Sequence, residues 1–162
     1  MLLLIECIIA CLIFTIIVLP PLYKNPMNQI MSYPTKIRKR VESLPEYKNN
    51  IKKDETKHIT RKIIAGILLV MILGLISYYS GAKTFIDCFK HSFILFLAVN
   101  IYDLVILDIL IFCHSKTSII PGTEDMIKEY RSPWHHIRGF FIGTTLGCLV
   151  SLLSSLFILI LF

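Results

Sequence analysis

The sequence predicts an all-α integral membrane protein, a four-helix bundle with short interfacial amphipathic helices on its cytoplasmic side. Three observations predict this class: the composition, four long apolar runs and an uneven distribution of positive charge. Of the 162 residues, 55% are hydrophobic and the mean hydropathy is +0.69. Soluble domains have an apolar share nearer ~45–50%. The lipid bilayer is therefore the expected partner, and no nucleic acid is expected.

One membrane domain is predicted over residues 1–162, with four spans at about 2–22, 63–79, 93–113 and 137–162. A membrane-crossing helix needs roughly 17–25 apolar residues, and each run satisfies this. Pro20-Pro21 should close the first span, because proline cannot donate to the helical ladder. No Lys or Arg precedes this run, so we expect a retained helix rather than a cleaved signal. Asp54 is expected to cap the helix that leads into the second span.

The loops 23–62 and 114–136 are predicted to be cytoplasmic and the hairpin 80–92 to be outside. The segment from Lys24 to Lys62 carries eleven Lys/Arg against four acids. Cytoplasmic loops are enriched in Lys and Arg, so the charge distribution predicts a multi-pass cell-membrane protein with both termini outside.

A short basic amphipathic helix is predicted in the first cytoplasmic loop. Ile37, Val41 and Leu44 recur at helical spacing after Pro34, with basic residues between them. We expect this helix to lie on the inner leaflet, where each nearby cation attracts anionic lipid by about 1 kcal/mol. A plain topology anchor is the alternative to specific headgroup recognition.

The second cytoplasmic loop should contain another short interfacial helix. Pro121-Gly122 predicts a turn, and Glu124 and Asp125 then fall in a first helical turn, where negative charge is favoured. Trp134 is placed as an interfacial anchor at the start of the last span.

The fourth span carries small residues at strict four-residue spacing. They are Gly139, Gly143, Gly147, Ser151 and Ser155. Such a face lets another helix approach closely, so the three glycines are predicted helix-packing residues. The partner could be another span of the chain, a second copy in a homo-oligomer, or another membrane protein.

The third span contains the polar residues that are hardest to explain as lipid-facing. At about 100° per residue, Asn100, Asp103 and His114 fall within a ~60° arc, and Asp108 lies ~80° to the side of Asn100. Ionisable side chains in a span are costly and mark functional sites by default. The stripe opens toward the cytoplasm, so Asp103, Asp108 and His114 are the predicted catalytic residues.

Three interpretations of this stripe stay open. Carboxylate and imidazole groups suit zinc, iron or manganese, so a divalent metal could be held at the inner surface. The tentative ligand set is Asp108, His114, Glu124, Asp125, Glu129 and His135, with His136 as an alternative to His135. Acid/base chemistry on a substrate contacted by Asn100, Glu124 and Trp134 is the second interpretation. Coupling of Asp103 to proton or cation movement is the third.

A purely structural interpretation stands beside these three. Asp103 and Asp108 could pair with Asn100, Arg138 or a hydroxyl group and merely fix helix packing, since polar contacts between helices serve as glue. His135 could be placed at the interface only. Glu6 is expected near the outer surface, apart from the inner site, and His91 is expected to face solvent.

Several motifs resemble a group of small uncharacterised bacterial four-span membrane proteins. The resemblance is carried by Asn100-Ile101-Tyr102-Asp103-Leu104, Asp108, Cys113-His114, Ile120 to Met126, Pro133-Trp134-His135, Tyr33-Pro34 and Leu44 to Tyr47. It implies a bacterial cell-membrane location and a shared architecture, and it implies no activity.

The leading functional hypothesis is a membrane enzyme or binding protein for a lipid or other amphiphile, reached from the inner leaflet. One alternative is a small proton- or cation-coupled transporter or channel subunit. The other is a structural partner of another membrane protein. The sequence does not decide whether the chain is an enzyme.

Overall fold

The computed structural model of the chain is all-helical. It describes residues 1–47 and 60–162 with their side chains, and in this part it contains no strand. The predicted cap Asp54 lies outside the described residues. The elements, in chain order, are α1 (Leu2–Lys24), η1 (Pro26–Ser32), α2 (Thr35–Ser43), α3 (Lys48–Tyr79), α4 (Phe85–Tyr102), the π-helix η2 (Asp103–Phe112), η3 (Lys116–Ser118), η4 (Glu124–Met126), α5 (Ile127–Tyr130) and α6 (Trp134–Leu161).

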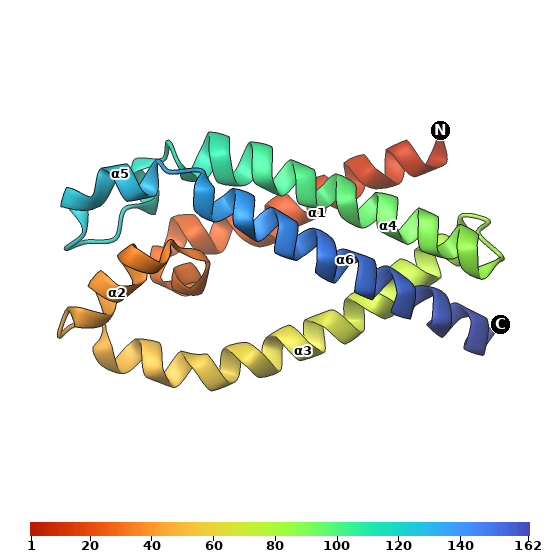
Figure 1. Ribbon diagram of the computed structural model, residues 1–162, viewed down its shortest axis with the longest axis horizontal. Coiled ribbons are helices and arrows are strands. Elements are labelled where there is room, and N and C mark those ends of the chain that lie inside the picture. Colours follow the sequence, from red (N-terminus) through yellow and green to blue (C-terminus); the bar gives the residue numbers. More distant parts are fainter.

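Within residues 1–47 and 60–162, four helices are long and apolar enough to cross a membrane. They cover Leu2–Lys24, Thr60–Tyr79, Phe85–Phe112 and Trp134–Leu161. Helix α6 contacts both α3 and α4, and α1 contacts α4. Both termini lie at one end of the molecule, which we call the terminal end, and α2 and α5 lie at the other, the loop-rich end (Figure 1).

Two helix boundaries differ from the sequence prediction. Helix α1 continues through Pro20 and Pro21 to Lys24. Proline removes a backbone donor but its φ suits a helix, so a final turn persists, closed by the Asn25 amide donating to the Pro21 carbonyl at 3.1 Å. Helix α4 begins at Phe85 rather than near residue 93, and the predicted hairpin 80–92 is therefore shorter.

The cause of the early start of α4 is a side-chain cap. The Thr84 hydroxyl accepts a hydrogen bond from the Asp87 amide at 3.2 Å and donates to the Asp87 carboxylate at 2.7 Å. This reciprocal arrangement satisfies one of the free amides of the first turn. The polar residues that follow, Lys90 and His91, are helical rather than part of a loop.

The small-residue face of α6 is occupied by α4 of the same chain. Phe96 of α4 lies directly against Gly147, and the Asn100 Oδ1 atom would lie 2.8 Å from a Cβ atom at Gly143. Gly139, in contrast, has no neighbouring side chain within 4 Å of that position. Gly143 and Gly147 therefore admit α4, whereas Gly139 leaves open space.

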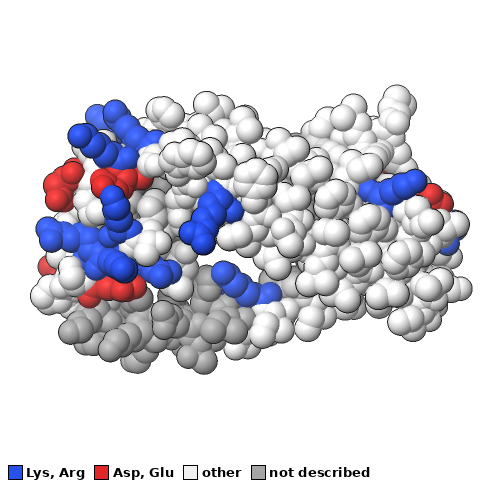
Figure 2. All heavy atoms as spheres, in the orientation of Figure 1, with Lys and Arg blue, Asp and Glu red and all other residues white. Residues whose placement is uncertain are grey.

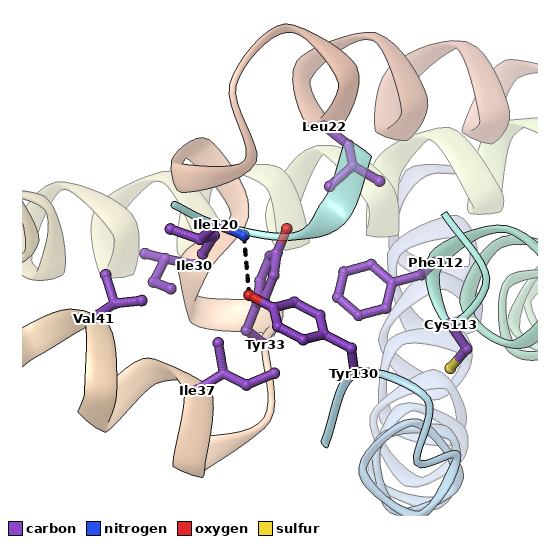
Figure 3. Packing of buried hydrophobic residues seen from close by; sticks show 9 residues of the cluster. All are labelled: Leu22, Ile30, Tyr33, Ile37, Val41, Phe112, Cys113, Ile120 and Tyr130. Carbon is purple, nitrogen blue, oxygen red and sulfur yellow. Dashed lines mark hydrogen bonds between the residues drawn. The ribbon is translucent and has the colours of Figure 1, made fainter. Parts of the chain in front are cut away.

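The loop-rich end contains a buried core that joins η1, α2, η2 and α5. Tyr33, Ile37 and Val41 are at most 1% exposed, and they pack with Phe112 and Tyr130 (Figure 3). The apolar face of α2 is thus covered by protein. The location of this helix on the inner leaflet stays a prediction, but its apolar face does not supply the contact with lipid, because a periodic pattern identifies an apolar face and not what covers it.

We predict that Gly147→Leu destabilises the fold. A side chain there would collide with Phe96, and overpacking typically costs about 1–3 kcal/mol. Thermal unfolding in detergent is the measurement, and Gly139→Leu is the matched control, because nothing lies within 4 Å of its Cβ position. Equal melting temperatures for the two variants would contradict this packing.

We predict that Tyr33→Phe costs about 1 kcal/mol, the usual contribution of one hydrogen bond. The Tyr33 hydroxyl donates to the Ser118 carbonyl at 2.9 Å. Burial, helped by the nearby Tyr130, raises the pKa of Tyr33, so its neutral form is stabilised in the fold. That stabilisation is complete below about pH 10 and is lost above it.

The measurement for Tyr33 is chemical unfolding at several pH values. The parent should lose stability above about pH 10 more steeply than Tyr33→Phe does. Tyr23→Phe, at an exposed position, is the control and should behave as the parent.

Candidate functional site

Helix α4 runs directly into the π-helix η2. The Cys113 amide donates to the Asp108 carbonyl at 2.9 Å, which is the i→i−5 pattern of a π-helix. Such winding is rare, usually confined to a single turn, and frequent at functional sites. In this geometry the hydrogen bonds join residues five apart, which lie on the same side of the helix. Asp103 and Asp108 therefore face one cavity, which corrects the expectation that Asp108 lies to the side.

The cavity lies between α1, η1, the α4–η2 helix and α6. Its volume is about 480 Å³. Asn100, Asp103 and Asp108 line it from α4 and η2, and His136 and Gly139 line it from α6. Phe14 and Gln29 contribute from α1 and η1. The cavity is thus amphiphilic, with two carboxylates and two imidazoles beside aromatic and aliphatic groups.

Asp108 and His136 form an ion pair across η2 and α6. The His136 Nδ1 atom lies 3.0 Å from the Asp108 Oδ1 atom, and the His136 side chain is only 5% exposed. The ring of Phe112 packs on the imidazole with centroids 5.0 Å apart. The thiol of Cys113 is also beside the imidazole. The ring is therefore fixed in orientation by a carboxylate and by packing.

The other nitrogen of this ring is enclosed by protein. The His136 Nε2 atom is buried and has no hydrogen-bond partner among residues 1–47 and 60–162. A carboxylate-oriented imidazole is the arrangement used to accept or donate a proton, provided that a reacting group comes within about 2.6–3.2 Å. A molecule bound in the cavity would therefore meet the pair at the partly exposed Asp108 carboxylate rather than at Nε2.

Asp103 differs from Asp108 because its carboxylate is unpaired. In the part of the chain that the structure describes, its side chain makes no hydrogen bond or ion pair, and it lines the cavity. An isolated carboxylate away from bulk water is costly. Asp103 is consequently the acid of the cavity that is free to pair with a ligand.

Asn100 holds α4 to α6. Its Nδ2 atom donates to the Phe140 carbonyl at 3.1 Å and to the Thr144 hydroxyl oxygen at 3.0 Å. Its amide is thereby fixed at the cavity wall. Asn100 was predicted to contact substrate, and the structure places it at the cavity with its donors already engaged.

The remaining predicted site residues are not gathered at the cavity. His114 is exposed, with its Nδ1 atom 2.9 Å from the Ile109 carbonyl oxygen of the same helix. His136 thus takes the place beside Asp108 that the sequence suggested for His114. Trp134 is 75% exposed and does not line the cavity.

The acids of the second loop point elsewhere. The Glu124 carboxylate accepts hydrogen bonds from the Gly122 amide at 2.9 and 3.1 Å, and Asp125 is exposed. Glu129 lies 3.6 Å from the Lys36 ammonium. Among the described residues, no three His, Cys, Asp or Glu side chains are arranged to hold a metal ion. The tentative metal-ligand set is therefore not brought together.

His135 lies at the edge of the cavity. Its Nε2 atom is 3.1 Å from the Ser32 carbonyl oxygen, so the ring bridges α6 and η1. This is a positioned residue at the cavity wall rather than a metal ligand in the described structure.

A second polar cluster at the terminal end was missed. The His91 Nε2 atom lies 2.9 Å from the Glu6 Oε2 atom, and its Nδ1 atom lies 3.1 Å from the Ser77 hydroxyl. Ser80 donates to the other Glu6 oxygen. The expectation that His91 faces solvent is wrong. Glu6 and His91 both lie near the starts of their helices, so a comparison of their expected depths in the membrane could have predicted this pair.

No protein-family model, curated protein or solved structure matches this chain.

The charged groups and aromatic rings that line the cavity indicate which kind of ligand would suit it. Asp108 is paired with His136, whereas Asp103 has no ion-pair partner in the described structure, so a cationic ligand would find an unpaired acid there. Phe14 and Phe140 also line it, and aromatic faces attract cations. A positively charged headgroup with an apolar tail fits these properties.

We predict opposite effects for the two aspartates on stability. Asp108→Asn should cost about 1–3 kcal/mol, because the buried His136 loses its charged partner. Asp103→Asn should be neutral or stabilising, since it removes an unpaired carboxylate. Thermal unfolding of both variants in one detergent is the measurement. A loss for Asp103→Asn as large as that for Asp108→Asn would show that Asp103 has a structural partner.

Proposed function

We propose that this chain is a multi-pass cell-membrane protein that binds an amphiphile with a cationic headgroup in the cavity beside Asp103. The observation that carries the proposal is the convergence of Asp103, Asp108 and His136 on one amphiphilic cavity between helices long enough to span a membrane. Intramembrane ionisable residues mark functional sites by default.

The charge distribution supports a cytoplasmic position for the cavity. Figure 2 shows Lys, Arg, Asp and Glu side chains gathered at the loop-rich end, a smaller group at the terminal end, and a largely uncharged surface between them. By the bias of Lys and Arg toward the cytoplasm, the loop-rich end faces inward and both termini face outward. An amphiphile would then enter from the inner leaflet. The exposed basic side of α2 would attract anionic lipid there.

The Asp108–His136 pair gives the same cavity a chemical capacity. A ligand whose charged head meets Asp103 would present its neighbouring groups to this pair. The imidazole paired with Asp108 is an acid/base group at the wall of this cavity. Binding is the function that we propose, and turnover of a bound amphiphile would use this pair.

The two alternative functions have weaker support. A carrier needs a polar route between the two ends. Glu6 and His91 supply polar groups at the terminal end, but between them and Asn100 lies the tight apolar contact of Phe96 with Gly147. A scaffold would use the small-residue face of α6, which α4 already covers at Gly143 and Gly147.

Binding of sphinganine, a cationic long-chain amine, is the test. The parent in phosphatidylcholine nanodiscs should bind tritiated sphinganine above the level of empty nanodiscs, and it should bind the neutral N-acetylsphinganine about tenfold more weakly. Asp103→Asn should weaken sphinganine binding about tenfold, because it removes the uncompensated charge. Gly139→Leu should also weaken it by filling the cavity.

Glu124→Gln is the control for charge, because Glu124 lies in the second loop and does not line the cavity. It should bind sphinganine as the parent does. Unchanged binding by both Asp103→Asn and Gly139→Leu would refute the cavity as the site.

A further inference from the structure

A second pocket adjoins the acidic cavity at the loop-rich end. Its volume is about 340 Å³. Thr35 and Lys36 line it from the first turn of α2 and Lys128 from α5, while Ser132 precedes α6 and His135 lies in its first turn. Two ammonium groups, two hydroxyls and an imidazole therefore surround one hollow.

The second pocket is basic overall. Glu129 lines it too, but its carboxylate is 3.6 Å from Lys36, whose side chain is 78% exposed. An exposed pair at that distance is weak and leaves the ammonium available. Lys128 makes no ion pair within the described part of the chain. Lysine binds phosphate as a point charge, and hydroxyl groups add hydrogen bonds to its oxygens.

His135 is common to the two hollows. It lines both the acidic cavity and the basic pocket, and its Nε2 atom lies 3.1 Å from the carbonyl oxygen of Ser32, which also lines the acidic cavity. One side of this residue thus faces the hollow with the unpaired Asp103 carboxylate, and the other faces the hollow with Lys36 and Lys128.

We infer that the ligand is a long-chain amino-phosphate, with its ammonium at Asp103 and its phosphate in the basic pocket. The inference rests on the proposed function. Asp103 belongs to the span Phe85–Phe112, whereas Lys36 and Lys128 lie outside all four spans. On the path from the membrane to the loop-rich end, a ligand with its tail in the membrane therefore meets the Asp103 carboxylate before it meets the ammonium groups of Lys36 and Lys128. The amine must stand between the tail and the phosphate.

Four long-chain probes with different headgroups test this order in nanodiscs. Sphinganine 1-phosphate carries both groups in the inferred order, sphinganine has no phosphate, and lysophosphatidic acid has no amine. Lysophosphatidylethanolamine carries both groups in the reverse order. The parent should bind sphinganine 1-phosphate at least about tenfold more tightly than each of the other three.

The matched variants remove two positive charges each. Lys36→Gln with Lys128→Gln should bind sphinganine 1-phosphate and sphinganine equally, with sphinganine binding unchanged. Lys39→Gln with Lys116→Gln is the control and should keep the preference, because neither lysine lines the pocket. Thermal unfolding checks that both variants are folded, and Lys128→Gln alone serves if the first double variant is not.

The outcomes separate this inference from the proposed function. If the parent binds sphinganine and its phosphate equally, the phosphate subsite is refuted and the amine-binding cavity stands. A preference that survives in the Lys36/Lys128 variant also refutes the subsite. Binding of lysophosphatidylethanolamine as tight as that of sphinganine 1-phosphate refutes the inferred order. Failure of every amine to bind refutes the proposed function itself.

Discussion

The close contact between α6 and the α4–η2 helix determines the rest of this structure. Lipid supplies no hydrophobic force between apolar helices, so their approach depends on small residues and polar contacts. Gly143 and Gly147 admit Asn100 and Phe96, and the Asn100 amide then donates across the contact. Because α6 is held in this register, His136 reaches Asp108 and the cavity forms between these helices and α1.

The two polar clusters differ in whether their carboxylates have partners within the protein. Glu6 at the terminal end has His91 and Ser80 as partners, so its cost in the span is offset by a network that ties α1 to α3 and α4. Asp103 has no such partner within residues 1–47 and 60–162, yet it is surrounded by space for another molecule. The first cluster explains how helices are held, whereas the second calls for a ligand.

The sequence predicted the helices well because long apolar runs are a strong local signal. The Pro121-Gly122 turn was equally local, and Gly122 has the positive φ of +86° that such a turn favours. The covering of Ile37 and Val41 was not predictable from periodicity. The site was harder to predict than the helices. Because π-helical winding has no sequence signature, the assumption of a regular α-helix placed Asp108 on the wrong side. Helical periodicity indicated His114 because it falls on the same arc as Asn100 and Asp103, whereas tertiary contact pairs Asp108 with His136.

Several features that cost folding free energy lie around the same cavity. The π-helix η2 departs from the favoured helical winding, Asp103 is an unpaired carboxylate, and the buried Nε2 atom of His136 lacks a partner in the described structure. Gly139 adds empty space where a larger residue could pack. A ligand that brings a cation to Asp103 offsets part of these costs, and it does so only in the folded state. Its binding energy therefore adds to the stability of the fold, and the site and the bundle are thermodynamically linked.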